Sequence, residues 1–275
     1  MPSHPSSNGY SAVNGSGGST TTSGDEEQPL LGGSRSLKSG WRKNMMADVN
    51  REWTDLILLA CYFVTGLLDS ASISTWGSFV SMQTGNTVYF GLGIAAPHES
   101  TRWIKSGASL GFFCIGSVFF SHFHRHFSPK RRWVLCASFT LQIALIIVAA
   151  FIFTYGPRSS DPREAIGWPE LVPIALIAFQ SCGQAVASRA LKHPALTSVV
   201  LTSIYCDLFS DYNLLAAQNI ERNRRVAAPL LLVGGAIAGG FLAHSSVGCV
   251  GALWIAAALK FVMVVAWLVW PTETE

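Results

Sequence analysis

The sequence predicts an all-α polytopic membrane protein with six transmembrane helices and two short re-entrant or broken helices. Only 13% of the 275 residues are charged, whereas soluble domains average about 25%. The mean hydropathy is +0.35. The charged residues are clustered, and several of the neutral stretches between them approach the roughly 20 apolar residues that cross about 30 Å of hydrocarbon.

Residues 1–50 are expected to form a disordered cytosolic tail, followed by a membrane domain over residues 51–271. The first 40 residues are mainly Ser, Gly, Thr and Pro, a composition that cannot bury enough apolar surface to offset the entropy of ordering. Within them, Glu26 and the pair Leu30 and Leu31 resemble the acidic di-leucine signals that sorting adaptors bind. Such a signal would direct the protein to an endosomal or vacuolar membrane instead of the plasma membrane. Chance occurrence is the alternative.

The expected spans are residues 56–76, 107–122, 133–155, 171–188, 226–244 and 250–270. Two further apolar segments, 78–96 and 195–212, are shorter or more polar. If both return to the side from which they enter, the basic loops at 125–132, 189–192 and 222–225 share a side with the N-terminal tail. The positive-inside rule favours this arrangement over eight full spans and places the N-terminus in the cytosol.

The six-span arrangement implies an inverted repeat, a plan common among secondary transporters. Each half then consists of a span, a re-entrant segment and two more spans, and the halves begin on opposite faces. The span after each re-entrant segment contains a GxxxG pattern, Gly107/Gly111 in the first half and Gly235/Gly239 in the second.

Asp69 is the only carboxylate between Asp55 and Glu99. A carboxylate in the hydrocarbon costs about 2.5–3.5 kcal/mol on insertion scales unless it is paired or hydrated. We therefore expect Asp69 either to serve a site or to cap the segment that follows. Lys260, inside the last span, would either extend to the interface or pair with a carboxylate such as Asp69.

The hydroxyl and amide groups of the two short segments are the other candidate binding groups. Gly85 permits a broken helix whose freed amides could face a ligand, and polar contacts between helices are the alternative. Asp207 and Asp211, four residues apart, would share a helix face, either at the solvent-facing end of the segment or in coupling to a cation or proton. The predicted substrate-binding residues are Asp69, Gln83, Thr84, Gly85, Asn86, Thr87, Gln184, Thr197 and Ser198.

Residues 66–71 (GLLDSA) and 79–87 (FVSMQTGNT) resemble the signature of the YoaK family. These are integral membrane proteins known mainly as domain of unknown function 1275. The resemblance extends over about residues 50–270. The family tends to show Gln-Asn where this chain has Gln184-Ala185. The resemblance implies no particular substrate, reaction or cofactor.

These observations favour a small-solute transporter or exporter with a polar site between the re-entrant segments. A membrane scaffold whose polar residues only pack helices is the alternative, and an intramembrane enzyme is a third. We find no hydrolase, P-loop or dinucleotide motif and no metal or redox spacing of the six cysteines, so we expect neither enzyme activity nor a cofactor. The net charge of +3 gives no indication of nucleic acid. The expected partners are the lipid bilayer, a small-molecule solute and a sorting adaptor.

Overall fold

The computed structural model describes residues 40–157, 166–216 and 218–273. These residues are helical, and no β-sheet forms within them. The helices are α2 (Thr54–Trp76), α3 (Gln83–Ala95), α4 (Arg102–Phe127), α5 (Arg132–Tyr155), α6 (Trp168–Ala190), the 3-10 turn η1 (Pro194–Leu196), α7 (Thr202–Phe209), α8 (Ile220–Ala243) and α9 (Gly248–Val269). Residues 1–39, which contain the predicted sorting signal, lie outside the described residues.

Six of these helices are long and apolar enough to cross a membrane, as predicted: α2, α4, α5, α6, α8 and α9. The predicted bounds differ most for α4 and α8, which begin five or six residues before the apolar run. Their first turns contain Arg102, Lys105, Glu221 and Arg222. Hydropathy detects only the part of a helix that lies in hydrocarbon, so it misses turns that continue at headgroup level.

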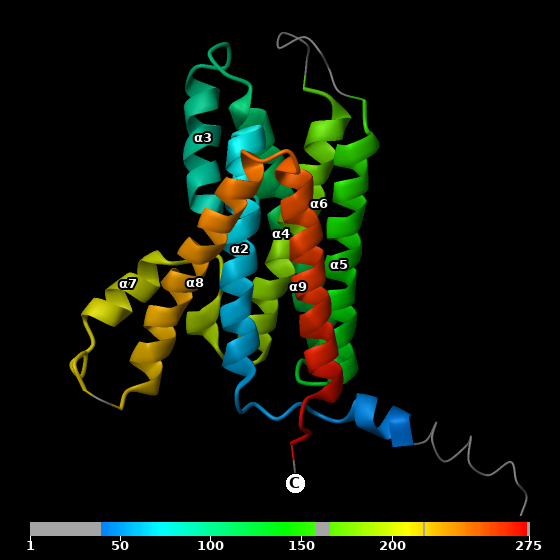
Figure 1. The fold of residues 1–275 in the computed structure, drawn as a ribbon, viewed down its shortest axis with the longest axis vertical. Coiled ribbons are helices and arrows are strands. Elements are labelled where there is room, and N and C mark those ends of the chain that lie inside the picture. Colours follow the sequence, from blue (N-terminus) through cyan, green and yellow to red (C-terminus); the bar gives the residue numbers. More distant parts are fainter. Residues whose placement is uncertain (1–39, 158–165, 217, 274–275) are drawn as a thin grey trace, which may run out of the picture. The chain divides into compact units, whose positions relative to one another are not determined.

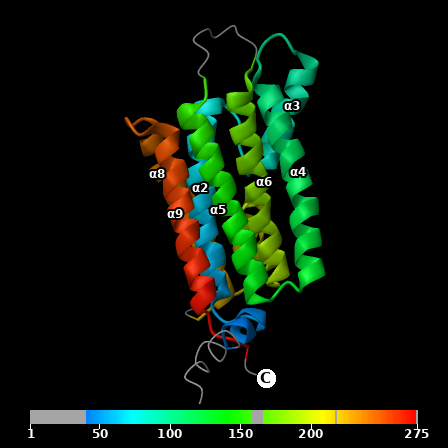
Figure 2. The same ribbon diagram turned by 90° about the vertical axis from the view of Figure 1, so that its right-hand side faces the viewer.

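The long helices alternate in direction, so the two halves of the chain are inverted. Figures 1 and 2 show α2, α5 and α8 running from one end of the helical unit to the other, and α4, α6 and α9 running back. We call the end where α2 begins the N-terminal end and the opposite end the far end. The first half starts at the N-terminal end and the second half, with α6, at the far end.

The first short segment leaves and re-enters at the far end. α2 ends at Gly77, whose φ of +73° is a left-handed conformation that suits glycine. An irregular stretch then leads to α3, and α4 begins at Arg102. The Arg102 side chain donates a hydrogen bond from Nε to the carbonyl of Gly77. Because the start of α4 contacts the end of α2, residues 78–96 are a re-entrant segment.

The second short segment leaves and re-enters at the N-terminal end. After α6, the carbonyl of Lys192 accepts a 2.5 Å hydrogen bond from Arg51, just before α2. In α8, Arg224 forms a 2.7 Å ion pair with Asp55 in the first turn of α2. The end of α6 and the start of α8 therefore both lie beside the start of α2. The prediction of six spans and two re-entrant segments is confirmed.

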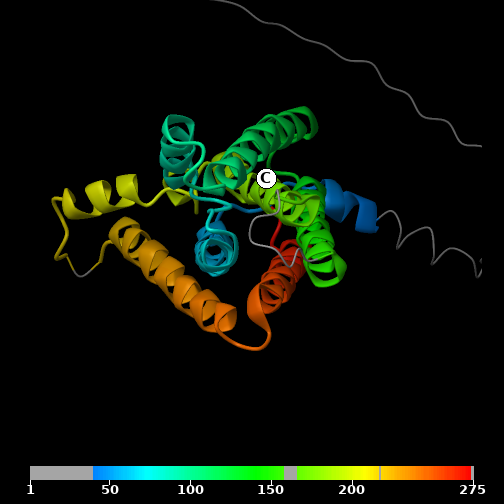
Figure 3. The same ribbon diagram turned by 90° about the horizontal axis from the view of Figure 1, so that it is seen from above.

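The packing of the long helices follows the exchange of the two halves. α2 packs most extensively against α8, α6 against α4, and α5 against α9. The inverted repeat relates α2 to α6, α4 to α8 and α5 to α9. Exchanging the halves therefore converts the α2–α8 pair into the α6–α4 pair, and it leaves the α5–α9 pair unchanged. α2 and α6 are the most buried helices, whereas α4 and α8 are largely exposed. Figure 3 shows α2 end-on with the other helices around it.

Glycines permit the close contact between α2 and α8. A Cβ at Gly235 would collide with the carbonyl of Phe63, and one at Gly239 would collide with the carbonyl of Leu67. The GxxxG pattern of the first half differs, because a Cβ at Gly111 would meet nothing within 4 Å and one at Gly107 would meet only a side chain of α3. Of the two patterns, only Gly235/Gly239 packs one span against another.

Residues 40–50, which the sequence analysis assigns to the tail, belong to the helical unit. Residues 40–46 are helical. Asp48 and Val49 form isolated bridges with Arg131 and Thr272 respectively, and Val49 is buried in the main apolar core. Val49 is a small apolar residue in a polar sequence, so it gives no periodic pattern. The packing of residues 40–50 against the helices could therefore not be predicted from the sequence.

We predict that Gly239→Ala destabilises the protein by about 1–3 kcal/mol, because the added methyl group must separate α2 from α8. Gly240→Ala is the matched control, since a Cβ there meets nothing within 4 Å, and its effect should stay within about 0.5 kcal/mol. Unfolding of the two purified variants in mixed micelles measures the difference. Equal stabilities would contradict the close contact.

Candidate functional site

Asp69 holds the irregular part of the first re-entrant segment. Its Oδ1 accepts hydrogen bonds from the backbone N–H groups of Val80 at 2.8 Å and Ser81 at 2.9 Å. Its Oδ2 accepts one from the hydroxyl of Ser81. The side chain is buried. Away from water, an irregular backbone needs such internal partners, so Asp69 caps this segment.

Asn86, in the first turns of α3, binds both polar backbone groups of Phe79. Its Oδ1 accepts from the N–H of Phe79 at 3.1 Å, and its Nδ2 donates to the carbonyl at 2.7 Å. Ser109 of α4 donates to the same carbonyl at 2.8 Å, and Gln83 donates to the carbonyl of Val80 at 3.3 Å. These amide and hydroxyl groups fix the path of the segment against α4.

Two further candidates of this stretch, Gly85 and Thr87, have lesser roles. A Cβ at Gly85 would press on the ring of Phe79, so glycine allows that ring to lie across the start of α3. The Thr87 hydroxyl bonds the carbonyl of Gln83 within the helix at 2.8 Å, and its side chain is exposed.

Gln184 of α6 holds the second re-entrant segment in a comparable way. Its Nε2 donates to the hydroxyl of Ser198 at 2.8 Å and to Thr65 of α2 at 2.6 Å. Thr197 is buried, and its carbonyl accepts from the N–H of Val200 at 3.2 Å. Three predicted residues of the second half, Gln184, Thr197 and Ser198, therefore lie together.

Lys260 is completely buried at the centre of the bundle. Its Nζ donates to the Oε1 atoms of Gln142 at 2.5 Å and Gln184 at 2.9 Å. It has no carboxylate partner among the described residues, so it neither extends to the interface nor pairs with Asp69, the two alternatives drawn from the sequence. Two amides thus solvate the cation, and one of them also binds the second re-entrant segment.

Sequence reasoning missed two buried amides. Gln142 is the only amide or charged residue in residues 133–155, a signal that could have revealed its role. Gln180 is completely buried, and neither its Oε1 nor its Nε2 bonds any described residue. Because the bond between Thr65 and Gln184 fixes the register of antiparallel α2 and α6, Gln180 lies at the level of Asp69, one turn further along.

A cavity of about 160 Å³ lies between the two re-entrant segments. Gln83 and Thr84, two of the predicted site residues, line it directly. Asp69 and Gln184 lie behind its wall, each bonded to or next to a lining residue. The lining consists of Ser81, Gln83 and Thr84 from the first segment, Val199 and Val200 from the second, Phe113 and Ser117 of α4, and Cys182, Ala185, Val186 and Arg189 of α6.

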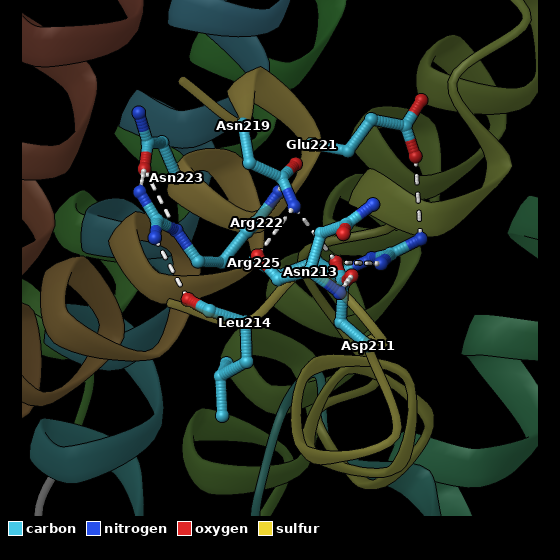
Figure 4. Close-up of polar contacts among 8 residues, drawn as sticks. All are labelled: Asp211, Asn213, Leu214, Asn219, Glu221, Arg222, Asn223 and Arg225. Atoms are coloured by element: carbon cyan, nitrogen blue, oxygen red, sulfur yellow. Dashed lines mark hydrogen bonds and ion pairs between the residues drawn. The ribbon is translucent and has the colours of Figure 1, made fainter. Parts of the chain in front are cut away.

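The connection from α7 to α8 contains a separate polar cluster, drawn in Figure 4. Asp211 accepts from the N–H of Asn213 at 2.9 Å, from Asn219 at 3.1 Å and from Arg225 at 3.3 Å. These contacts, the N–H of Asn213 first, lower the pKa of Asp211. Since α7 ends at Phe209, the expectation that Asp207 and Asp211 share a helix face is wrong. Asp211 organises the connection.

The six apolar helices and the buried polar site define a multi-pass helical membrane protein. The family described as "Protein of unknown function (DUF1275)" matches residues 57–266, so the chain belongs to this family, and the expectation from residues 66–71 and 79–87 is confirmed. No curated protein and no solved structure matches the chain.

We predict that Asp69→Asn lowers stability by about 1–3 kcal/mol. The amide keeps one acceptor oxygen, but it loses the charge that strengthens bonds from Val80 and Ser81, and bonds to charged groups contribute about 1.5–3 kcal/mol. Ser74→Ala, an exposed position on the same helix, is the control. Thermal unfolding in detergent measures both variants. An unchanged or raised melting temperature for Asp69→Asn would rule out a capping role.

Proposed function

We propose that this protein is a small-solute transporter or exporter whose binding site is the cavity between the two re-entrant segments. The observation that supports this most directly is the cavity, which brings Ser81 and Thr84 of one half within reach of Val199 and Val200 of the other. Its volume of about 160 Å³ corresponds to about five water molecules at roughly 30 Å³ each. A solute of about five non-hydrogen atoms fits this space.

The arrangement of the two halves supports movement around this site. In inverted-repeat transporters, substrates bind where the repeats meet, and one repeat rocks against the other. Here each half contributes a re-entrant segment, and each segment is held by a different buried polar centre, Asp69 in one half and Gln184 with Lys260 in the other. A relative shift of the halves would open and close the cavity, and it would exchange the bonds that cross between them, from Gln184 to Thr65 and from Lys260 to Gln142. No catalytic group is required, and we propose no enzyme activity.

A non-transporting scaffold is the second candidate. The observation in its favour is that Asp69 and Asn86 direct their hydrogen bonds to neighbouring backbone and side chains. On this alternative the cavity has no ligand, and the polar residues only pack helices.

We also propose that the N-terminal end faces the cytosol, because Arg51, Arg131, Lys192 and Arg224 gather there. The signal at Glu26, Leu30 and Leu31 would then be accessible to a sorting adaptor. It would place the protein in an endosomal or vacuolar membrane, and a protein without a working signal would reside in the plasma membrane.

Labelling of an introduced cysteine, with the four buried cysteines retained, tests this orientation. Exposed Cys114 and Cys206 are first replaced by serine, and cysteine is then placed at Ser210, at the N-terminal end, or at Ser100, at the far end. With only the plasma membrane permeabilised, a membrane-impermeant maleimide should reach Ser210→Cys from the cytosol. In an internal membrane, Ser100→Cys should react only after detergent, and at the cell surface it should react in intact cells. The opposite pattern would reverse the orientation.

Filling the cavity tests the transport function. Cells lacking the protein are complemented with the wild type, with Ala185→Leu, or with Ala258→Leu, which enlarges an exposed alanine of α9. Untargeted metabolite profiles should differ between the deletion and the wild type. Ala185→Leu should resemble the deletion because the added side chain occupies the site.

The control Ala258→Leu should resemble the wild type. Both variants are checked for normal abundance and melting temperature, so that a misfolded variant is not mistaken for a blocked one. A folded Ala185→Leu that restores the profile fully would exclude the cavity as the transport site. Identical profiles for the deletion and the wild type would favour the scaffold.

A further inference from the structure

The charges in and behind the cavity wall indicate what kind of solute it accepts. Arg189, in the last turn of α6, lines the cavity and is exposed. Its guanidinium forms no ion pair or hydrogen bond with any described residue, and no carboxylate lines the cavity. A guanidinium offers five N–H donors in a planar arrangement that matches an oxyanion. The one charged group that faces the cavity is therefore an unpaired cation.

The ionisable groups behind the wall do not reverse this sign. The oxygens of Asp69 already accept the N–H groups of Val80 and Ser81 and the hydroxyl of Ser81, so they are turned away from a ligand. Lys260 is connected to the second segment by Gln184, which accepts from Lys260 and donates to Ser198. Lys260 has no counter-ion among the described residues. With Asp69 ionised and Lys260 protonated, these three groups carry a net charge of +1, and with both buried groups neutral Arg189 alone leaves the same charge.

The uncharged lining adds a further donor. Thr84 is exposed, lines the cavity, and its hydroxyl has no hydrogen-bond partner among the residues described. Gln83 and Thr84 are also the first residues of α3, where backbone N–H groups lack intrahelical acceptors. The N–H of Gln83 donates to the carbonyl of Ser81 at 3.1 Å, and that of Thr84 has no acceptor among the described residues. The side-chain amide of Gln83 is already bonded at both ends, its oxygen to Asn86 at 3.0 Å and its nitrogen to Val80 and Ser109. The groups free to contact a solute are mainly donors.

We propose that the solute is a small monovalent oxyanion of about four or five non-hydrogen atoms, bound by Arg189 and Thr84. This inference rests on the proposed transport function for its physiological meaning, but the anion site itself can be tested by binding alone. The unpaired guanidinium and the lack of a carboxylate at the wall disfavour a cationic solute of the same size, and a neutral solute would leave the charge of Arg189 unpaired.

Three probes of the same planar shape with four non-hydrogen atoms separate the charge classes: nitrate, urea and guanidinium. Each is added at 10–50 mM to the purified full-length protein, with sodium gluconate, too large for the cavity, matching the ionic strength. A ligand that binds only the folded state raises the melting temperature. Nitrate should raise it, and urea and guanidinium should not.

Arg189→Gln should weaken the nitrate effect at least tenfold in half-saturating concentration. Lys192→Gln, which removes an exposed cation three residues further on, is the matched control and should behave as the wild type. Three results would overturn the anion site. All three probes could stabilise the protein equally, Arg189→Gln could respond to nitrate like the wild type, or Lys192→Gln could lose as much of the nitrate response as Arg189→Gln. A shift that anionic phosphatidylglycerol produces and nitrate does not would also overturn it, in favour of a lipid headgroup.

Uptake into proteoliposomes separates this inference from the transport function. Isotope-labelled nitrate should enter, and Ala185→Leu should block its entry. Nitrate binding that depends on Arg189 but occurs without flux would keep the anion site and overturn the transporter. Entry of urea or guanidinium that Ala185→Leu blocks, without nitrate entry, would keep the transporter and overturn the anion site.

Discussion

The backbone between α2 and α3 runs through the interior of the helical unit without belonging to a helix or a sheet. Its N–H and C=O groups must therefore be bonded by side chains, because unsatisfied groups away from water cost several kcal/mol each. The carboxylate of Asp69 bonds the two N–H groups of Val80 and Ser81, and Ser181 of α6 donates to the carbonyl of Val80 at 3.0 Å. The path of this stretch determines where α3 begins and where one wall of the cavity lies.

The two halves satisfy the same constraint with opposite chemistry. The first half uses an acceptor, Asp69, to bind backbone donors. The second half uses a donor amide, Gln184, to bind the hydroxyl of Ser198, and this amide is held in turn by Lys260. Both arrangements place a charged or charge-bound side chain six or seven residues before the end of a span. Each re-entrant segment is thus bonded to a span of its own half, while bonds from Gln184 to Thr65 and from Ser181 to Val80 connect the two halves.

Much of this fold follows from hydropathy and charge, and much of the site does not. The count of Lys and Arg was sufficient to favour six spans over eight, because the two short segments return to the side they leave. Asp69, Gln83 and Asn86 were recognisable, since polar groups in an apolar stretch need partners. The hydrogen-bond partners of these residues could not be predicted. Whether Asp69 bonds Ser81 or Lys260 depends on how residues 11 or more positions apart in the sequence approach each other in space. Gln142 and Gln180 were missed because one or two amides in an apolar helix do not disturb its periodicity.

The contacts of Lys260 also offset the cost of burying a polar group. A cation buried without a counter-ion is costly unless dipoles replace its hydration. Gln142 and Gln184 supply two carbonyl dipoles, and the ring of Phe139 lies 5.5 Å from Nζ. These groups solvate the charge without cancelling it. On the proposed anion binding, the unpaired Arg189 at the lining and Lys260 without a counter-ion behind it would favour an occupied cavity over an empty one.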